Sequence, residues 1–399
     1  MTTDKGVWGL QQVRDKQLQS LWTYSAPGGD AGKLFAWGNN ENGQLGQNNT
    51  TRYSSPVQIA GTNWSSKMVG LDGNSNAHYA SSFSVIKYDG TLWSWGENEH
   101  GRLGDNTSVD KSSPVQIPGT TWESIAGEVE HRAAIKTDGT LWVWGYNIVG
   151  QLGLNSTTQY ASPVQVPGTT WSKVSCGYRS TMATKTDGTL WLWGVSSDGS
   201  SGTNQPPSVQ YSSPTQIPGT TWQHPYRMRE FSGAIKTDGT LWMWGRGYDG
   251  ATGQNNRTDV SSPIQVPGTW KEISGGTQPY VVAVKTDGTA WGWGNGRQGQ
   301  LGQNQGSANI YYSSPTQIGT DTTWNTISAG YYASVGTKTD GTLWTWGNNT
   351  NISDGSEANS GALGLNDRTS RSSPTQVGSS TQWSQGAMGG SWGIAFEAL

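Results

Sequence analysis

Short apolar runs alternate with polar, glycine-rich segments along this chain, and their pattern follows a strand period rather than a helical one. In the clearest copy, Leu141 and Val143 alternate with Trp142 and Trp144, which places both indoles on one face of a strand. A Thr-Asp-Gly segment at 137–139 separates this run from the apolar run before it. Because Gly readily takes the positive φ of a tight turn, the arrangement predicts a β-hairpin. We expect about four short strands in this unit and an all-β chain.

A tryptophan motif marks seven copies of the unit. Trp-x-Trp, or Phe-x-Trp in the first copy, is followed at once by Gly and recurs at intervals of about fifty residues, which is typical of repeat architectures. A further tryptophan follows Gly-Thr in most units. Because buried aromatic side chains dominate core energetics, tryptophans in register are predicted to be core residues rather than ligand sites. The last aromatic residues of the seven motifs are Trp37, Trp95, Trp144, Trp193, Trp244, Trp293 and Trp346.

The two ends of the repeat region predict how it closes. Six units carry a complete Lys-x-Asp-Gly hairpin, whereas the first unit begins at 32–37 without the strand that should precede its turn. The last residues, 393–399, have the composition of that missing strand. We therefore predict a seven-bladed β-propeller over residues 29–399, closed by pairing of the C-terminal strand with the first blade, which removes exposed sheet edges. A linear solenoid is the alternative, but it would carry distinct polar caps, which are not evident.

The repeat resembles the regulator-of-chromosome-condensation repeat family, whose members form seven-bladed propellers. The matching segments are Trp-Gly-Glu-Asn at 95–98 with Gly-Arg-Leu-Gly at 101–104, Trp-Gly-Tyr-Asn at 144–147 with Gly-Gln-Leu-Gly at 150–153, and Ser-Pro-Val at 113–115. The resemblance covers residues 32–399. Kelch repeats have a similar period, but their Gly-Gly doublet does not recur here at the repeat interval.

Charge and composition narrow the function. Lys and Arg number 25 against 28 Asp and Glu, and this balance argues against a nucleic-acid surface, which needs clustered basic residues. The founding member of the family binds chromatin and drives nucleotide exchange on a small GTPase. We do not expect that function here, because the chain has neither a basic tail nor an evident inserted wedge. The single cysteine, Cys176, excludes an intrachain disulfide, and no membrane insertion or secretion signal is expected.

Catalytic constellations are not evident in the sequence. The four histidines share no metal-ligand spacing with other His, Cys or acidic residues, and Cys176 has the environment of a small core residue. The Asp of Lys-Thr-Asp-Gly occurs in every complete hairpin, where turn chemistry explains it better than acid–base catalysis. No Gly-rich phosphate loop of the Walker type occurs. The chain is predicted not to be an enzyme, with no cofactor and no metal.

Binding residues are expected where the copies differ. One variable segment follows Gly-Gln-Leu-Gly in each unit, and a second lies just before the Ala-Ile-Lys strand. Equivalent propeller loops emerge on one face, so the second set should form a ring of aromatic and arginine side chains, the types enriched at binding hot spots. The alternative is that these side chains only cover the blade tops, because single aromatic residues are common on protein surfaces. The candidates are Tyr79, His131, Arg132, Tyr178, Arg179, Arg229, Phe231, Tyr280, Tyr331, Tyr332 and Trp392.

Residues 1–28 lie outside the repeat and are predicted to form an N-terminal anchoring arm with a short helix. The apolar residues of this arm are Val7, Trp8, Leu10, Val13, Leu18, Leu21 and Trp22. An isolated helix of about a dozen residues is marginal in water, so the arm must dock, either on its own propeller or on another protein. The segment at 6–14, with Leu21 and Trp22, resembles N-terminal segments of virion proteins from tailed phages.

Together these features predict a tailed-phage virion protein, assembled in the host cytoplasm and docked through its arm on other virion proteins. Its loops would recognise a host-surface protein or glycan, or a neighbouring virion protein. The alternative is a free bacterial protein-binding or inhibitor propeller, because other propellers of the resembled family bind proteins, including a β-lactamase inhibitor, through comparable loop faces.

Overall fold

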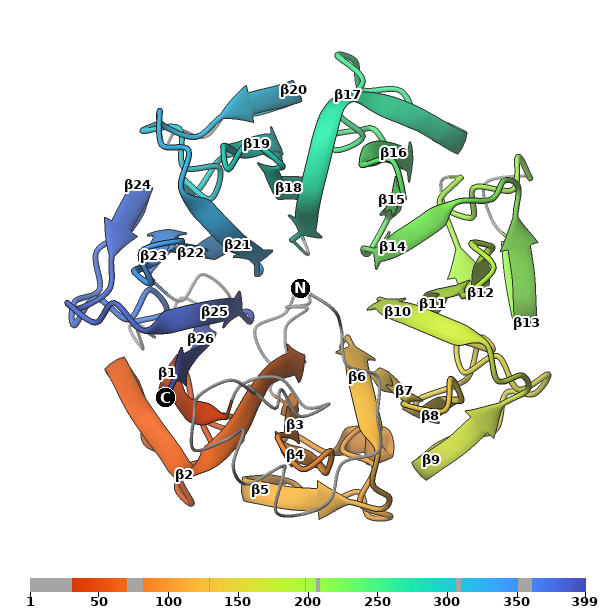
Figure 1. The fold of residues 1–399 in the computed structure, drawn as a ribbon, viewed down its shortest axis with the longest axis horizontal. Coiled ribbons are helices and arrows are strands. Elements are labelled where there is room, and N and C mark those ends of the chain that lie inside the picture. Colours follow the sequence, from red (N-terminus) through yellow and green to blue (C-terminus); the bar gives the residue numbers. More distant parts are fainter. Residues whose placement is uncertain are drawn as a thin grey trace, which may run out of the picture.

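The computed structural model describes residues 31–69, 82–128, 130–197, 199–205, 209–276, 278–305, 310–350 and 361–399. These residues form 26 strands and one short 3-10 helix, arranged as a ring of seven blades around a central axis (Figure 1). The predicted all-β, seven-bladed propeller is confirmed. Within the described residues no helix is long and apolar enough to cross a membrane.

The elements, in chain order, are β1 (Gly32–Gly38), β2 (Tyr53–Val69), β3 (Ser82–Lys87), β4 (Leu92–Gly96), η1 (Glu99–Gly101), β5 (Lys111–Ile117), β6 (Trp122–Gly127), β7 (His131–Lys136), β8 (Leu141–Gly145), β9 (Tyr160–Val166), β10 (Trp171–Gly177), β11 (Ser180–Lys185) and β12 (Leu190–Ser196). They continue with β13 (Val209–Ile217), β14 (Trp222–Arg227), β15 (Phe231–Lys236), β16 (Thr240–Gly245), β17 (Val260–Gly275), β18 (Tyr280–Lys285), β19 (Ala290–Asn295), β20 (Tyr311–Gln317), β21 (Trp324–Ala329), β22 (Ala333–Lys338), β23 (Leu343–Gly347), β24 (Arg371–Gln376), β25 (Trp383–Met388) and β26 (Trp392–Ala398).

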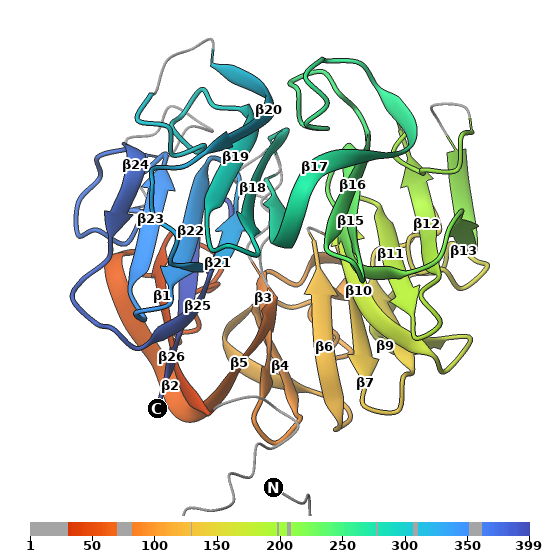
Figure 2. The ribbon, with the colours of Figure 1, turned by 45° about the horizontal axis from the view of Figure 1, so that its top comes forward.

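Each blade is an antiparallel sheet of four strands whose innermost strand borders the central axis. Blades 3, 4 and 7 are β6–β9, β10–β13 and β21–β24. The long strands β2 and β17 each cross from one blade to the next: β2 is outermost in blade 1 and innermost in blade 2, and β17 does the same for blades 5 and 6 (Figure 2).

The C-terminal strand closes the ring as predicted. Blade 1 consists of β25, β26, β1 and the first half of β2, so it combines both ends of the repeat region. Strand β26 pairs antiparallel with β1 along its whole length, from Gly32 opposite Ala398 to Gly38 opposite Trp392. Strand β26 also pairs with β25, and β1 also pairs with β2, so neither end of the repeat region leaves an unpaired strand edge.

The predicted hairpin turn has the expected chemistry. Gly139 takes a φ of +76°, and the Asp138 carboxylate accepts hydrogen bonds from the backbone N–H of Thr140 at 3.0 Å and from its hydroxyl at 2.7 Å. The Thr140 hydroxyl in turn accepts a hydrogen bond from Trp142 Nε1 at 2.9 Å. The turn is therefore tied directly to the first tryptophan of the Trp-x-Trp motif, which explains why the residues recur together.

The second tryptophan of the motif joins each blade to the preceding one. In six of the seven copies its indole Nε1 donates to a backbone carbonyl in the Gly-x-x-Gly loop of the preceding blade, at 2.7–3.1 Å. The last Gly of that loop lies against the same indole: a Cβ on Gly104 would be 2.6 Å from Trp144 Nε1. Between blades 7 and 1, Trp37 donates to Ala362 at 2.7 Å and lies against Gly364. Tryptophan and glycine are thus required together at every junction.

The hydrophobic core is divided among the junctions between blades. Seven apolar clusters occur in the described residues, and each combines side chains from two neighbouring blades. Leu141, Val143 and Trp144 are all fully buried, so the strand does not have one core face and one solvent face. Both faces of a blade pack on neighbouring blades, whereas Trp142 of the same strand is partly exposed.

The recurring lysine of the hairpin stacks between two tryptophans. In blade 3, Lys136 Nζ lies 4.7 Å from the ring centroid of Trp122 and 4.2 Å from that of Trp142, and the same pair of contacts occurs in blades 2 and 4–7. Such contacts are attractive because the ring face is negative. Blade 1 differs, since Glu397 occupies the lysine position and forms an ion pair with Lys33 at 3.6 Å.

Candidate functional site

Both variable loops of each unit emerge on the same face of the ring, which we call the loop face. In blade 3 the segment after β6 and the segment after β8 lie at the same ends of their strands, and Tyr146 N donates to the Glu130 carbonyl at 2.9 Å. The Thr-Asp-Gly turns lie at the other ends of the strands, on the opposite face. The variable sequence is therefore gathered on one face and the repeated turns on the other.

Five of the predicted contact residues are buried, and for them the prediction of an exposed contact side chain was wrong. Their exposed fractions are 0% for His131, 3% for Arg132, 1% for Phe231, 0% for Tyr280 and 1% for Trp392. Four of them are the first residue of the second strand of a blade, where neighbouring blades enclose the side chain. The hydroxyl of Tyr280, for example, donates to the Ala333 carbonyl of the next blade at 2.8 Å.

His131 and Arg132 show what these buried positions do. His131 Nε2 lies 2.8 Å from the Thr181 hydroxyl of blade 4, and burial, followed by the charge of Arg132, lowers the pKa of His131 to about 3. The imidazole is therefore neutral at physiological pH. The Arg132 guanidinium donates to the Glu128 carbonyl and to the Ser82 hydroxyl of blade 2. Both side chains join adjacent blades rather than facing a partner.

The remaining predicted residues within the described ranges are partly exposed. Tyr178, Arg179, Arg229, Tyr331 and Tyr332 all lie on the loop face and keep contact with solvent. Tyr331 and Tyr332 pack edge to face at 4.3 Å between ring centroids, and burial followed by the neighbouring Tyr331 raises the pKa of Tyr332 above its usual range. Tyr79 and all seven arm residues lie outside the described residues.

Arginine and tyrosine side chains from blades 4–7 form a continuous patch on the loop face. The guanidinium of Arg229 lies 5.3 Å from the Tyr178 ring centroid, and Tyr248 is 60% exposed, which is high for an aromatic residue. A pocket of about 290 Å³ lies within the patch at the junction of blades 5 and 6, lined by Arg229, Glu230, Arg246, Tyr248, Asp249, Gln278, Pro279, Asn295 and Arg297. We call the following residues the arginine–tyrosine patch: Tyr178, Arg229, Arg246, Tyr248, Arg257, Arg297, Tyr311, Tyr331 and Tyr332.

Five members of the patch were not among the sequence candidates: Arg246, Tyr248, Arg257, Arg297 and Tyr311. Three of them, Arg246, Tyr248 and Arg297, lie in the loop directly after a Trp-x-Trp motif, whose sequence is repeated with little change in other blades. A signal for them exists in the sequence. In blade 3, Asn147 holds this loop, because its amide donates to the carbonyls of Ser156 and Thr158 and its Oδ1 accepts from Leu152 N.

Asn40, Asn98 and Asn349 occupy the same position in blades 1, 2 and 7 and make equivalent bonds. In blades 5 and 6 glycine replaces the asparagine, at Gly247 and Gly296. Serine replaces it in blade 4, at Ser196, so the framework changes at three successive blades, two of which form the pocket.

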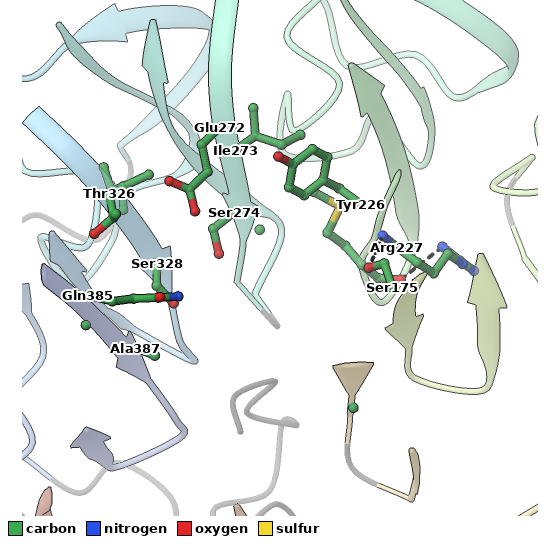
Figure 3. Close-up of a pocket in the computed structure, with 15 residues that line it drawn as sticks. Ser175, Tyr226, Arg227, Glu272, Ile273, Ser274, Thr326, Ser328, Gln385 and Ala387 are labelled. Carbon is green, nitrogen blue, oxygen red and sulfur yellow. Dashed lines mark hydrogen bonds between the residues drawn. The ribbon is translucent and has the colours of Figure 1, made fainter. Parts of the chain in front are cut away.

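The central channel is a second hollow, lined by the innermost strands (Figure 3). It encloses about 190 Å³. Burial raises the pKa of the Glu272 carboxyl to about 7, opposed by the charge of Lys271 and a hydrogen bond from the backbone of Ile327, although water still reaches part of the side chain. Burial and the charge of Glu272 also raise the pKa of Tyr226 above its usual range.

Polar groups of the channel mainly join neighbouring blades. Ser175 Oγ accepts a hydrogen bond from Arg227 N at 2.8 Å, and Ser274 Oγ accepts one from Ala329 N at 3.0 Å. The Arg227 guanidinium is buried and donates to Ser180, Ser200 and Ser232 hydroxyls and to two backbone carbonyls. Because these groups are engaged within the ring, the arginine–tyrosine patch is the better candidate for contact with another molecule.

The two side-chain types that the sequence offered for catalysis, the cysteine and the turn aspartates, have structural roles. Cys176 is 2% exposed within an apolar cluster, and the turn carboxylate of Asp138 has a lowered pKa because Thr140 donates hydrogen bonds to it. Among residues of the described ranges, no group of three or more His, Cys, Asp or Glu side chains could hold a metal ion.

Comparison with known proteins agrees with the repeat. The "Regulator of chromosome condensation (RCC1) repeat" model matches residues 31–70, 89–134, 138–184 and 287–336, and a second model of the same description matches 324–352. The chain is 31% identical over 119 residues to the secretion-regulating guanine nucleotide exchange factor of Bos taurus, covering 28% of this chain and 26% of that protein. It is 33% identical over 87 residues to human protein RCC2, covering 22% and 16%. The chain thus spans about a quarter or less of the length of these relatives.

Solved structures match over nearly the whole ring. Prp20p from Saccharomyces cerevisiae has a TM-score of 0.76 at 17% identity, covering 93% of this chain and 92% of that chain. Human WBSCR16 has a TM-score of 0.73 at 18% identity, covering 92% and 98%. At such identities the likeness concerns the fold alone. With the repeat motifs, the tryptophan–glycine junctions and the ring closure, these matches show that the chain belongs to the regulator of chromosome condensation (RCC1) repeat family of β-propellers.

Proposed function

We propose that this chain is a non-enzymatic protein-binding module whose arginine–tyrosine patch contacts a partner protein. The observation that carries the proposal is the concentration of tyrosine and arginine from four successive blades on one face, with Tyr248 largely exposed. Tyrosine and arginine are enriched at binding hot spots because they bury large areas and donate several hydrogen bonds. The residues of the repeated framework, by contrast, make contacts within the ring, both inside a blade and between neighbouring blades.

Relatives support a binding role without identifying the partner. Yeast Prp20p is described as binding Gsp1p and histones, and the bovine relative is named as a guanine nucleotide exchange factor. Neither partner is carried over to this chain, because at 17% identity the likeness to Prp20p concerns the fold alone and the bovine relative matches over only 28% of this chain.

Site-specific photo-crosslinking in the source cell tests the proposed face. A photoreactive amino acid at Tyr248 should give a discrete protein adduct. The matched control is Thr186, an exposed residue of a turn on the opposite face, which should give none. Equal adduct patterns at the two positions would contradict a binding role for the loop face.

The finer proposal is that the module is mounted on a tailed-phage particle through residues 1–28, with the loop face directed to a host-surface molecule or a neighbouring virion protein. Its support is the resemblance of residues 6–14 to phage virion segments. Peptide mass spectrometry of purified particles should then detect the chain at a stoichiometry comparable to that of known structural proteins. Absence from the particles would favour the alternative, a free bacterial binding or inhibitor propeller.

Deletion of residues 1–28 separates the two roles. A mounted protein should keep its melting temperature and lose incorporation into particles, whereas a free binder should keep its binding activity. An unfolded truncation product would contradict the anchoring role, because it would mean that the arm stabilises the propeller itself.

A further inference from the structure

Three guanidinium groups of the arginine–tyrosine patch form no ion pair with any other described residue. Arg229 lies 5.3 Å from the ring of Tyr178, and Arg257 and Arg297 lie 4.6 and 4.9 Å from the ring of Tyr311. Stacking on a ring leaves the in-plane N–H donors of a guanidinium available, and it restrains the group before a ligand arrives. These arginines therefore present donors for which the described residues supply no carboxylate.

Carboxylates of the same region already have donors. Glu230 is paired with Arg246 at 2.6 Å, Asp249 accepts from Asn295 Nδ2 at 3.1 Å, and Asp259 accepts from Gly247 N at 2.8 Å. Each of these carboxylates thus has a donor among the described residues, whereas Arg229 and Arg297 in the same pocket have no carboxylate partner there. A planar carboxylate is the natural partner, because the guanidinium fork can donate to both of its oxygens.

The surroundings indicate which kind of anion fits. Acidic residues lie among the arginines, and the chain carries a net charge of −3, so a densely charged polyanion would meet repulsion. A protein segment carries spaced carboxylates, and its peptide N–H groups can donate to Oε1 of Gln278, which lines the same pocket and whose Nε2 donates to the Tyr331 hydroxyl at 3.1 Å. Tyr248 offers an exposed ring at the rim for apolar parts of the segment.

We propose that the pocket between blades 5 and 6 receives a carboxylate from an acidic segment of the partner protein, bound between Arg229 of blade 5 and Arg297 of blade 6. The inference rests on the proposed protein-binding function and specifies the chemistry of its partner.

Fluorescence anisotropy with a labelled peptide of alternating Glu and Gly tests this on the purified full chain. The Glu-Gly peptide should bind and a Gln-Gly peptide should not, and rising salt should weaken binding because the contact is ionic. Each of Arg229→Ala and Arg297→Ala should weaken binding about tenfold, the scale of one charge-assisted hydrogen bond. Arg52→Ala is the matched control, since Arg52 is a loop-face arginine already ion-paired with Glu41, and it should change binding less than about twofold.

Three outcomes would overturn the inference: no binding of the Glu-Gly peptide, equal weakening by Arg52→Ala, or tighter binding of heparin that is lost in the same two variants, which would make the ligand a sulfated glycan. The crosslinking assay keeps this failure separate from that of the proposed function. If the adduct at Tyr248 survives in the Arg229→Ala/Arg297→Ala double variant, the protein-binding role stands and the acidic partner does not.

Discussion

Gly364 offers a test of how the ring is closed. This glycine ends the Gly-x-x-Gly loop of blade 7, has a φ of +67°, and lies directly against the indole of Trp37 in blade 1. A Cβ at this position would be 2.9 Å from Trp37 Nε1, closer than real side chains approach. The Gly364→Ala variant should therefore force the indole away and strain its hydrogen bond to the Ala362 carbonyl.

Gly378 provides a matched control in the same blade. Its φ of +60° is nearly the same, but a Cβ there would meet nothing within 4 Å. Both alanine variants suffer the cost of a left-handed conformation, about 1–2 kcal/mol, which a stiffer unfolded chain offsets by roughly 0.4–1 kcal/mol. Only Gly364→Ala adds overpacking, about 1–3 kcal/mol. The difference between the two variants isolates the steric contact.

Calorimetry measures this difference. An unfolding entropy of about 2.1 cal/mol/K per residue gives a cooperative ring of this size a loss of roughly 1 °C in Tm for each kcal/mol. Gly364→Ala should therefore melt about 1–4 °C below Gly378→Ala. Equal melting temperatures would refute the reasoning, because they would mean that the contact with Trp37 does not restrain the closing junction.

Three further predictions concern stability. Lys136→Met removes a cation held between two indoles and should cost about 0.5–2 kcal/mol in denaturant unfolding, whereas Lys173→Met, at an exposed lysine without such a contact, should cost almost nothing. Glu272→Gln tests the raised pKa of this carboxyl: because the folded-state pKa of about 7 lies above the unfolded value, the wild type loses stability as pH rises from about 4.5 through 7. The variant should therefore melt at a higher temperature than the wild type at pH 8 and at a similar temperature at pH 4, and a difference in Tm that does not depend on pH would contradict the raised pKa. Tyr280→Phe removes the hydroxyl donor of the Gly330 carbonyl, whereas the Ala333 carbonyl keeps its bond from Gly330 N, and should cost about 1–3 kcal/mol; Tyr178→Phe on the loop face should leave Tm unchanged, and equal losses would place both in the core.

The fold could be predicted because the repeated residues each make a contact that defines a blade or a junction. The Asp-Gly turn, the lysine and the paired tryptophans recur together since they touch one another, and the glycine after each loop recurs since the next blade's indole lies on it. Ring closure could also be predicted from the sequence, because the strand missing at one end of the repeat region is present at the other end.

The binding face could be predicted only in part, for physical reasons. Variation before the second strand marked Tyr178 and Arg229 correctly as accessible, but it also marked Phe231 and Tyr280, which vary because each fills a differently shaped space between blades. Packing between neighbouring blades decides whether a side chain at the end of a strand is buried, and the local sequence does not record that packing. Residues of the pocket such as Tyr248 lie in a loop that is framework in other blades, so only the loss of its asparagine signals the change.

Calorimetric titration of the partner protein, once crosslinking has identified it, into purified variants tests whether the loop face of blades 5 and 6 is the binding surface. We expect Tyr248→Ala and Arg297→Ala each to weaken binding about tenfold or more, at unchanged Tm, while Thr186→Ala on the opposite face has no effect. Undiminished affinity in the two patch variants, or a loss in Thr186→Ala, would contradict it.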